Sequence, residues 1–121
     1  MILVDANIWI DHLRQHDPLL DDLIQSGGFW VHPYTIAEIG LGSLANRELV
    51  IDQLERMPTA PVAHHQDVMA LISRNKIAGT GVGYVDCHLL ASAVLNASKL
   101  WTRDRRLEKI AILLGVQHAP N

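Results

Sequence analysis

Three short apolar segments, separated by long stretches of helical composition, most constrain how this chain folds. They cover residues 2–4, 29–31 and 100–102 and are rich in β-branched, aromatic and leucine side chains. Strands with helices between them pair in parallel, because a parallel pair needs a long crossover connection that is usually a helix. The pattern therefore predicts an α/β fold: a three-layer α/β/α sandwich around a small, mainly parallel central sheet.

Periodicity and capping residues place the helices between these segments. We expect helices over residues 8–15, 18–25, 35–44, 48–57, 66–76, 86–97 and 105–114. Asn7 is the expected N-cap of the first helix, and two consecutive glycines at 27–28 end the second. A break between two prolines leaves room for a short strand near Val62.

Composition fits one domain in a reducing compartment. A chain of 121 residues with 49% hydrophobic positions has the size of one unit, so we expect a single domain over residues 1–121. Cys87, as the single cysteine, cannot form an internal disulfide. No apolar run approaches the roughly 20 residues that span a bilayer, and the first residues lack a signal-peptide pattern. We therefore expect a cytoplasmic protein that does not associate with membranes.

Charge is distributed unevenly along the chain. The net charge of −3 argues against a simple electropositive nucleic-acid binder, yet residues 1–60 sum to −6 and residues 61–121 to +3. Five of the later bases occupy eleven consecutive positions: Lys99, Arg103, Arg105, Arg106 and Lys109. Such a cluster can contact phosphate groups, although charge alone favours the simpler interpretation of a solvated helix face.

Four acidic residues occupy positions where a charge is costly or functional. Asp5 and Asp104 each follow the carboxyl end of an expected strand, which is where ligands bind in open α/β sheets. Asp86 and Glu38 lie on the apolar stripes of their helices, so each is expected to point inward or into a cleft. Taken singly, each has a structural explanation such as a helix cap or an Asx turn, but together they predict a functional site.

Carboxylates that meet in one site repel one another unless a cation compensates their charge. Mg²⁺ and Mn²⁺ are the ions that oxygen ligands favour. An ion held by acids binds phosphate, activates water near neutral pH and stabilises a leaving oxygen. The acidic residues therefore predict metal-assisted hydrolysis of a phosphodiester.

The residues around these acids resemble the PIN-domain ribonucleases, and among them the VapC-type toxins of bacterial toxin–antitoxin pairs. The matching segments are residues 4–10 (VDANIWI), 36–39 (IAEI), 84–91 (YVDCHLLA) and 100–107 (LWTRDRRL). Intervals of 33, 48 and 18 residues between the four acids also fit the family. The resemblance covers the whole chain and implies a PIN-like fold and Mg²⁺-dependent endoribonuclease activity. Ala6 departs from the Thr or Ser of many relatives, at a position with no expected chemistry.

The resemblance also assigns roles to individual residues. The acidic quartet would be Asp5, Glu38, Asp86 and Asp104, with Asn7 and Thr102 ordering metal or water. Asp5 and Asp104 are expected to hold the main Mg²⁺, for which Mn²⁺ can substitute, while the other two acids complete the charge. Hydrolysis would leave 5′-phosphate and 3′-hydroxyl ends, and the neighbouring phosphates would contact the basic cluster, chiefly Lys99, Arg103, Arg105 and Arg106.

Partners follow from the same resemblance. It implies an RNA substrate, a cognate VapB-like antitoxin and a homodimer. An extended arm of the antitoxin would place an Arg or Lys against the carboxylates and act as a surrogate for the metal.

Two other classes of protein remain as alternatives. A catalytically silent PIN-like module would bind RNA or its partner without cutting, although the intact quartet argues against it. A receiver-like phosphoacceptor module has a similar length, but it needs a Lys after its last strand, where this chain has Asp104.

Other conspicuous residues favour structural roles. His88 faces a different side of its helix from Asp86 and is expected to make a local hydrogen bond. Trp9, Trp30 and Trp101 could stack on bases, but their apolar neighbours favour packing. Residues 78–83 are glycine-rich but lack the Lys of a nucleotide-binding loop, which predicts a mobile connection.

Overall fold

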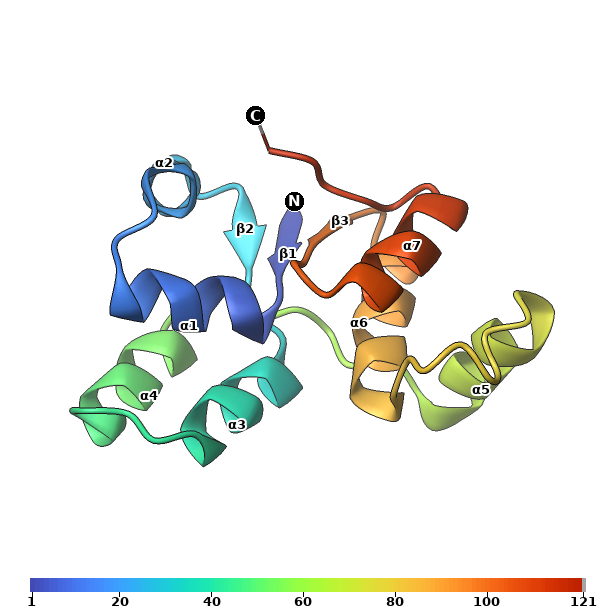
Figure 1. The fold of residues 1–121 in the computed structure, drawn as a ribbon, viewed down its shortest axis with the longest axis horizontal. Coiled ribbons are helices and arrows are strands. Elements are labelled where there is room, and N and C mark those ends of the chain that lie inside the picture. Colours follow the sequence, from blue (N-terminus) through green and yellow to red (C-terminus); the bar gives the residue numbers. More distant parts are fainter. Residues whose placement is uncertain (121) are drawn as a thin grey trace.

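A three-stranded, fully parallel sheet forms the centre of the computed structural model, which describes residues 1–120 (Figure 1). The strands are β1 (Ile2–Val4), β2 (Phe29–Trp30) and β3 (Lys99–Trp101), in the order β2-β1-β3. Ile2 pairs with Phe29 on one side and with Lys99 on the other. The first strand of the chain is therefore the central strand of the sheet, as the expected parallel α/β fold requires.

Seven helices connect and cover the strands of the described chain. They are α1 (Ala6–Arg14), α2 (Pro18–Ser26), α3 (Pro33–Leu41), α4 (Arg47–Glu55), α5 (His65–Arg74), α6 (Tyr84–Leu95) and α7 (Arg105–Leu113). All seven expected helices are present, with bounds that differ by a few residues. α3, for example, begins earlier than expected, because proline is favoured in a first turn and the His32 imidazole accepts a hydrogen bond from the Tyr34 N–H.

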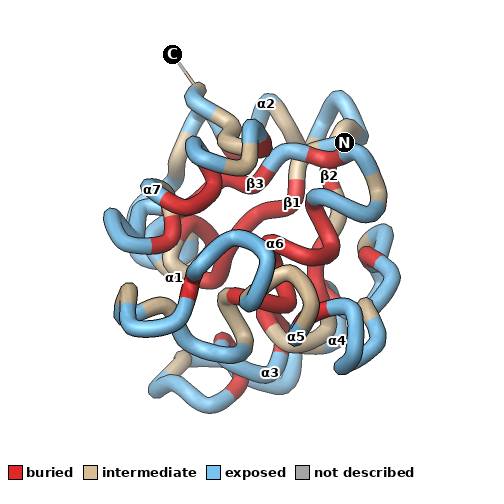
Figure 2. Tube along the Cα trace, turned by 90° about the vertical axis from the view of Figure 1, so that its right-hand side faces the viewer, coloured by how far each residue is buried: buried red, intermediate tan, exposed pale blue. Residues whose placement is uncertain are grey.

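Side chains alternate between the two faces of the sheet and form two separate hydrophobic cores. Leu3 and Leu100 pack with residues of α5, α6 and α7, whereas Val4 and Trp101 pack with residues of α1 to α4. Figure 1 shows these two groups of helices on opposite sides of the sheet, and Figure 2 shows the buried path through β1, β3 and α6. The predicted three-layer sandwich is therefore confirmed.

The N-cap of α1 is Asp5, so the prediction of Asn7 was wrong. The Asp5 backbone is extended, and its carboxylate accepts a hydrogen bond from the Ala6 N–H at 2.7 Å. The helix begins directly after β1, and Asn7 lies within its first turn. This leaves the Asn7 amide free to contact the segment that follows β3.

The expected strand near Val62 is absent from the described chain. A single parallel bridge instead joins Val31 to Thr59, in which Val31 donates to the Pro58 carbonyl and Ala60 donates to the Val31 carbonyl. The segment of Val31 cannot continue the ladder, because α3 begins at Pro33, which has no N–H, so pairing ends before Val62. None of the described helices is long and apolar enough to cross a membrane.

Gly27 ends α2 in the left-handed conformation, with φ of 74°. We expect Gly27→Ala to lower the free energy of unfolding by about 1 kcal/mol, because a side chain is strained at this φ. Gly28→Ala is the matched control, since Gly28 has no positive φ and an added Cβ would make only ordinary contacts at 3.7 Å or more. Urea denaturation measures the free energy of unfolding of both variants. Equal losses in the two would contradict the prediction that the positive φ of Gly27 is the cause.

Candidate acidic site

The carboxyl ends of β1 and β3 meet at one edge of the sheet and bring Asp5 to Thr102. The Asp5 N–H donates to the Trp101 carbonyl at 2.9 Å, which continues the pairing of the two strands by one residue. The Thr102 hydroxyl donates to Asp5 Oδ2 at 2.7 Å. Asp5 is only 6% exposed, so a carboxylate lies almost buried where two central strands end.

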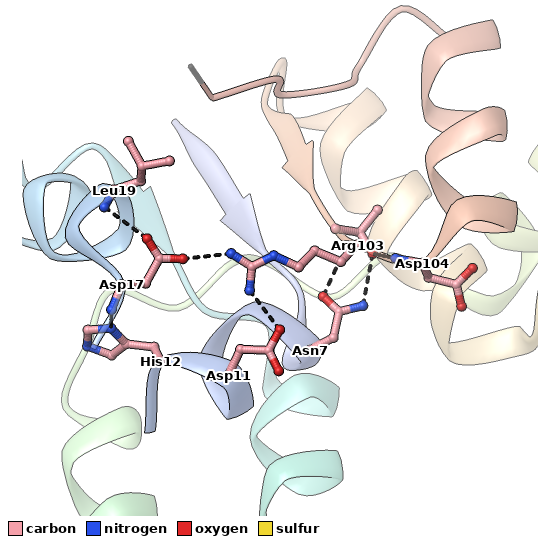
Figure 3. A network of polar contacts seen from close by, with 8 residues as sticks. Asn7, Asp11, His12, Asp17, Leu19, Arg103 and Asp104 are labelled. Carbon is pink, nitrogen blue, oxygen red and sulfur yellow. Dashed lines mark hydrogen bonds and ion pairs between the residues drawn. The ribbon is translucent and has the colours of Figure 1, made fainter. Parts of the chain in front are cut away.

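The Thr102 hydroxyl organises the turn that leads to Asp104. Its oxygen accepts hydrogen bonds from the Asp104 N–H at 3.1 Å and from Asn7 Nδ2 at 3.3 Å. Asn7 Oδ1 in turn accepts a hydrogen bond from the Arg103 N–H at 3.2 Å (Figure 3). A hydroxyl has one proton and two lone pairs, so the bonds of Thr102 use its full capacity. Thr102 thus fixes Asp5 and the backbone of Asp104 together.

Asp104 and Asp86 both lie at helix N-termini. Asp104 caps α7, because its Oδ1 accepts hydrogen bonds from the Arg106 N–H at 2.9 Å and the Leu107 N–H at 3.2 Å. Asp86 is in the first turn of α6 and is half-buried. Both carboxylates therefore have a local structural role in addition to any function.

Glu38 lies within α3 and is exposed to solvent. Its neighbours Ile36 and Ile39 are buried in the core, but the Glu38 carboxylate is not. The sequence predicted that Glu38 points either into the core or into a cleft, and the structure excludes the core. Glu38 instead faces the solvent on the side where it interacts electrostatically with Asp5 and Asp86.

Raised pKa values show that the acids share one electrostatic site. Burial is the largest cause of the raised pKa of Asp5 and Asp86. For Glu38, which is exposed overall, partial loss of hydration is the largest cause of the raised pKa. The charge of Asp104 raises the pKa of Asp5 further, and the charge of Asp5 does so for Asp86 and Glu38. Among the described residues, none of the four forms an ion pair with a basic side chain. Their mutual repulsion is therefore uncompensated within the chain.

The donor set fits a hard divalent cation. All four groups are carboxylates, and within the described chain only one of the two Asp104 carboxylate oxygens accepts a hydrogen bond. No three His, Cys, Asp or Glu side chains of residues 1–120 are grouped closely enough to enclose an ion. Carboxylate oxygens are nevertheless the ligands that hard divalent cations prefer.

The basic cluster is only partly free to contact phosphate. Arg103 forms ion pairs with Asp11 at 2.8 Å and with Asp17 at 2.6 Å, which fold its guanidinium against α1 and the start of α2 (Figure 3). Lys99 begins β3, at the opposite end from the acids, and its Nζ donates to the Gly115 carbonyl. The structure therefore does not bring these two bases freely to the acidic edge.

Arg105 and Arg106 are exposed at the start of α7, beside Asp104. Arg106 extends over Gly81, where an added Cβ would lie 2.8 Å from its Nη1. The arginine thereby connects α7 to the glycine-rich segment 78–83 that precedes α6.

Sequence analysis missed the role of Asp11 and Asp17 as partners of Arg103. Asp11 lies four residues after Asn7 on α1, so a shared helix face was the available signal. Asp17 gave no such signal, because its contact with Arg103 depends on the path of the chain between α1 and α2.

The prediction for His88 was wrong, whereas the prediction that Trp9 and Trp101 pack in the core is confirmed. Both ring nitrogens of His88 are buried without a hydrogen-bond partner in the described chain, so the predicted local hydrogen bond was wrong. The ring instead packs between Tyr34 and Tyr84. Trp9 and Trp101 are buried in the core, as predicted.

The fold is that of a PIN domain. The PIN-domain family model matches residues 2–113, and the chain belongs to this family. Over 117 residues it is 41% identical to Ribonuclease VapC32 of Mycobacterium tuberculosis, in both strain CDC 1551 and strain H37Rv. That match covers 96% of this chain and 94% of the relative. The chain is therefore a homologue of VapC-type ribonucleases, as the sequence resemblance indicated.

Solved structures agree on the fold. FitAcB from Neisseria gonorrhoeae matches with a TM-score of 0.67 and 18% identity, covering 97% of this chain and 95% of that chain. PAE2754 from Pyrobaculum aerophilum matches with a TM-score of 0.64 and 17% identity, covering 96% and 90%. At these identities the likeness supports the shared architecture alone.

The raised pKa values predict how stability depends on pH. A carboxyl whose pKa is raised binds more protons in the folded than in the unfolded chain, so it lowers the free energy of unfolding as pH rises above about 4. We expect Asp5→Asn to weaken this decrease, measured by urea denaturation between pH 3 and 7. Asp17→Asn should act in the opposite direction. Burial raises the pKa of Asp17, but the hydrogen bond and charge of Arg103, together with backbone hydrogen bonds from Leu19 and Leu20, outweigh it and lower that pKa. Equal pH profiles for both variants would contradict the assignment.

Proposed function

We propose that this chain is a Mg²⁺-dependent endoribonuclease and the toxin of a VapC-type toxin–antitoxin pair. The observation that carries the proposal is the acidic edge, where four carboxylates influence one another and have no cationic partner in the described chain. The similarity to Ribonuclease VapC32 supports RNA as the substrate. Hydrolysis of RNA phosphodiester bonds is the reaction that best accounts for both the four carboxylates and the similarity to a ribonuclease.

The proposed division of roles starts from burial and hydrogen bonding. Asp5 and Asp104 would hold the main ion, because Thr102 fixes the positions of both. Its hydroxyl donates to the Asp5 carboxylate and accepts a hydrogen bond from the Asp104 N–H. Asp86 and Glu38 would complete the charge, while Asn7 orients the turn between β3 and α7. A bound ion would lower the pKa of water and stabilise the leaving oxygen. If water bonds to the phosphorus and the bond to the 3′ oxygen breaks, the products carry 5′-phosphate and 3′-hydroxyl ends.

Phosphate contacts are proposed from the free part of the basic cluster. Arg105 and Arg106 start α7 next to Asp104 and can reach phosphates on either side of the reacting one. Lys99 and Arg103 remain candidates from the sequence, but each would first release its internal partner. We therefore assign the main phosphate contacts to Arg105 and Arg106.

The partners and setting of the protein are also proposals. We infer a VapB-like antitoxin whose arm places an Arg or Lys against the carboxylates, because such a cation would relieve the repulsion described above. We further propose a homodimer of one PIN-like domain per chain, covering residues 1–121, in the cytoplasm. The unpaired, buried Cys87 agrees with a reducing compartment.

A cleavage assay tests the proposed activity. We expect the purified protein to cut total cellular RNA at discrete sites with Mg²⁺ or Mn²⁺ and not with EDTA. Asp5→Asn with Asp104→Asn should reduce cleavage about a hundredfold or more, because the variant loses the charges that hold the ion while keeping the shape of both helix caps. End mapping should find 5′-phosphates.

Two results would count against this function. Cleavage that persists in EDTA, or that leaves 2′,3′-cyclic phosphates, would exclude the metal-dependent mechanism. A folded, partner-free protein that binds RNA but never cuts it would favour the alternative, a catalytically silent PIN-like module.

A thermal-shift measurement tests the metal site separately from activity. Mg²⁺ or Mn²⁺ at ten times its Kd should stabilise the fold by about 1.4 kcal/mol, or roughly 4–8 °C in melting temperature, by relieving the repulsion among the carboxylates. Asp5→Asn with Asp104→Asn should lose most of this response. KCl at equal ionic strength is the control, and an equal shift with KCl would show general screening only.

A further inference from the structure

A cluster of aromatic and histidine rings that plays no part in the acidic site lies between α3, α5 and α6. Tyr34 and Tyr84 flank His88, with ring centroids 4.8 Å and 4.7 Å from the imidazole and edge-to-face geometry. His65 completes the group, because its Nδ1 lies 2.6 Å from the Tyr84 hydroxyl. We call Tyr34, His65, Tyr84 and His88 the aromatic cluster.

The aromatic cluster borders the acidic site through two helices. Tyr34 lies four residues before Glu38 on α3, and residues at this spacing share a helix face. Tyr84 is the first residue of α6, in the same turn as Asp86 but, two positions before it, on a different side of the helix. The helices that carry two of the four carboxylates therefore also carry the two tyrosines of the cluster.

Tyr84 is held in place yet open to solvent. The residue is 45% exposed, while His65 contacts its hydroxyl and His88 contacts its ring. Little conformational freedom remains to be lost on binding, which is the condition for a preorganised contact. The buried His88 has no hydrogen-bond partner at either nitrogen in the described chain, and such unpaired groups are rare in ordinary packing.

We propose that Tyr84, positioned by His65 and His88, stacks on an unpaired nucleobase next to the phosphate that the acidic site receives. This inference rests on the proposed function and adds a binding subsite to it. An aromatic ring accepts any base, because every base has a π face, but a base within a duplex cannot reach it. The subsite therefore selects single-stranded or looped RNA and has little preference among bases.

Fluorescence of RNA containing 2-aminopurine tests the subsite without cleavage. Full-length Asp5→Asn protein is titrated into short unstructured RNA oligonucleotides that carry the probe at each position in turn. Stacking on Tyr84 should quench the fluorescence of 2-aminopurine at one position of the oligonucleotide. Adding Tyr84→Ala should weaken binding about tenfold and remove that quenching, whereas Tyr84→Phe should keep both. Ile112→Ala, which removes an exposed side chain near the far end of α7, is the matched control and should change neither.

The outcomes separate the subsite from the proposed function. If wild-type protein cuts RNA but Tyr84→Ala leaves KM and quenching unchanged, the stacking subsite is wrong and the nuclease stands. If wild-type protein does not cut but quenching still depends on the Tyr84 ring, the stacking subsite stands and the proposed nuclease activity is wrong. Loss of antitoxin binding alone in Tyr84→Ala would assign the ring to a protein contact and overturn the proposal. The melting temperature of Tyr84→Phe and Tyr84→Ala checks that both variants fold.

Discussion

The acidic site depends on the parallel pairing of β1 with β3. Val4 lies opposite Trp101, and the Asp5 N–H donates to the Trp101 carbonyl, so both strands end at the same level. A slip of one residue would exchange the two faces of β3 and send Leu100 into the wrong core. Because each core contains residues from both strands, burial of hydrophobic side chains fixes the register and, with it, the position of Asp5 relative to Thr102.

The site itself opposes the stability of the fold that positions it. Burial and mutual repulsion raise the pKa of Asp5, Asp86 and Glu38, which means that each carboxylate is less favourable here than in water. Hydrogen bonds from Thr102 and Ala6 offset only part of this cost for Asp5. The two cores must supply the remainder, which is typical of sites that perform chemistry.

The sequence predicted the elements well because hydrophobic spacing is local information. The three strands, seven helices and the strand-end positions of Asp5 and Asp104 all follow from short windows of sequence. Contacts between distant segments could not be predicted in this way. Arg103 is expected to contact phosphate, and the sequence did not show that Asp11 and Asp17, which both lie more than 80 residues earlier in the chain, hold its guanidinium.

His88 shows the same limit of sequence reasoning in a buried position. Its surroundings come from α3 and α6 together, so the sequence of its own helix could not show that its ring lies between two tyrosines. The wrong N-cap prediction for Asn7 has a different cause, because Asp and Asn are equally favoured N-caps and Asp5 lies only two positions earlier. The turn after β1 decided between them by placing Asp5 in an extended conformation next to the Ala6 N–H.

Helix N-termini explain how the chain tolerates so many like charges in one place. Asp5 caps α1, Asp104 caps α7, and Asp86 lies in the first turn of α6. The N-terminus of a helix carries a partial positive charge and free N–H groups, which stabilise a carboxylate and equally a phosphate. Glu38, in the interior of α3, lacks this support, but it is exposed to solvent. The same three helix ends therefore offset part of the repulsion among the acids that they carry.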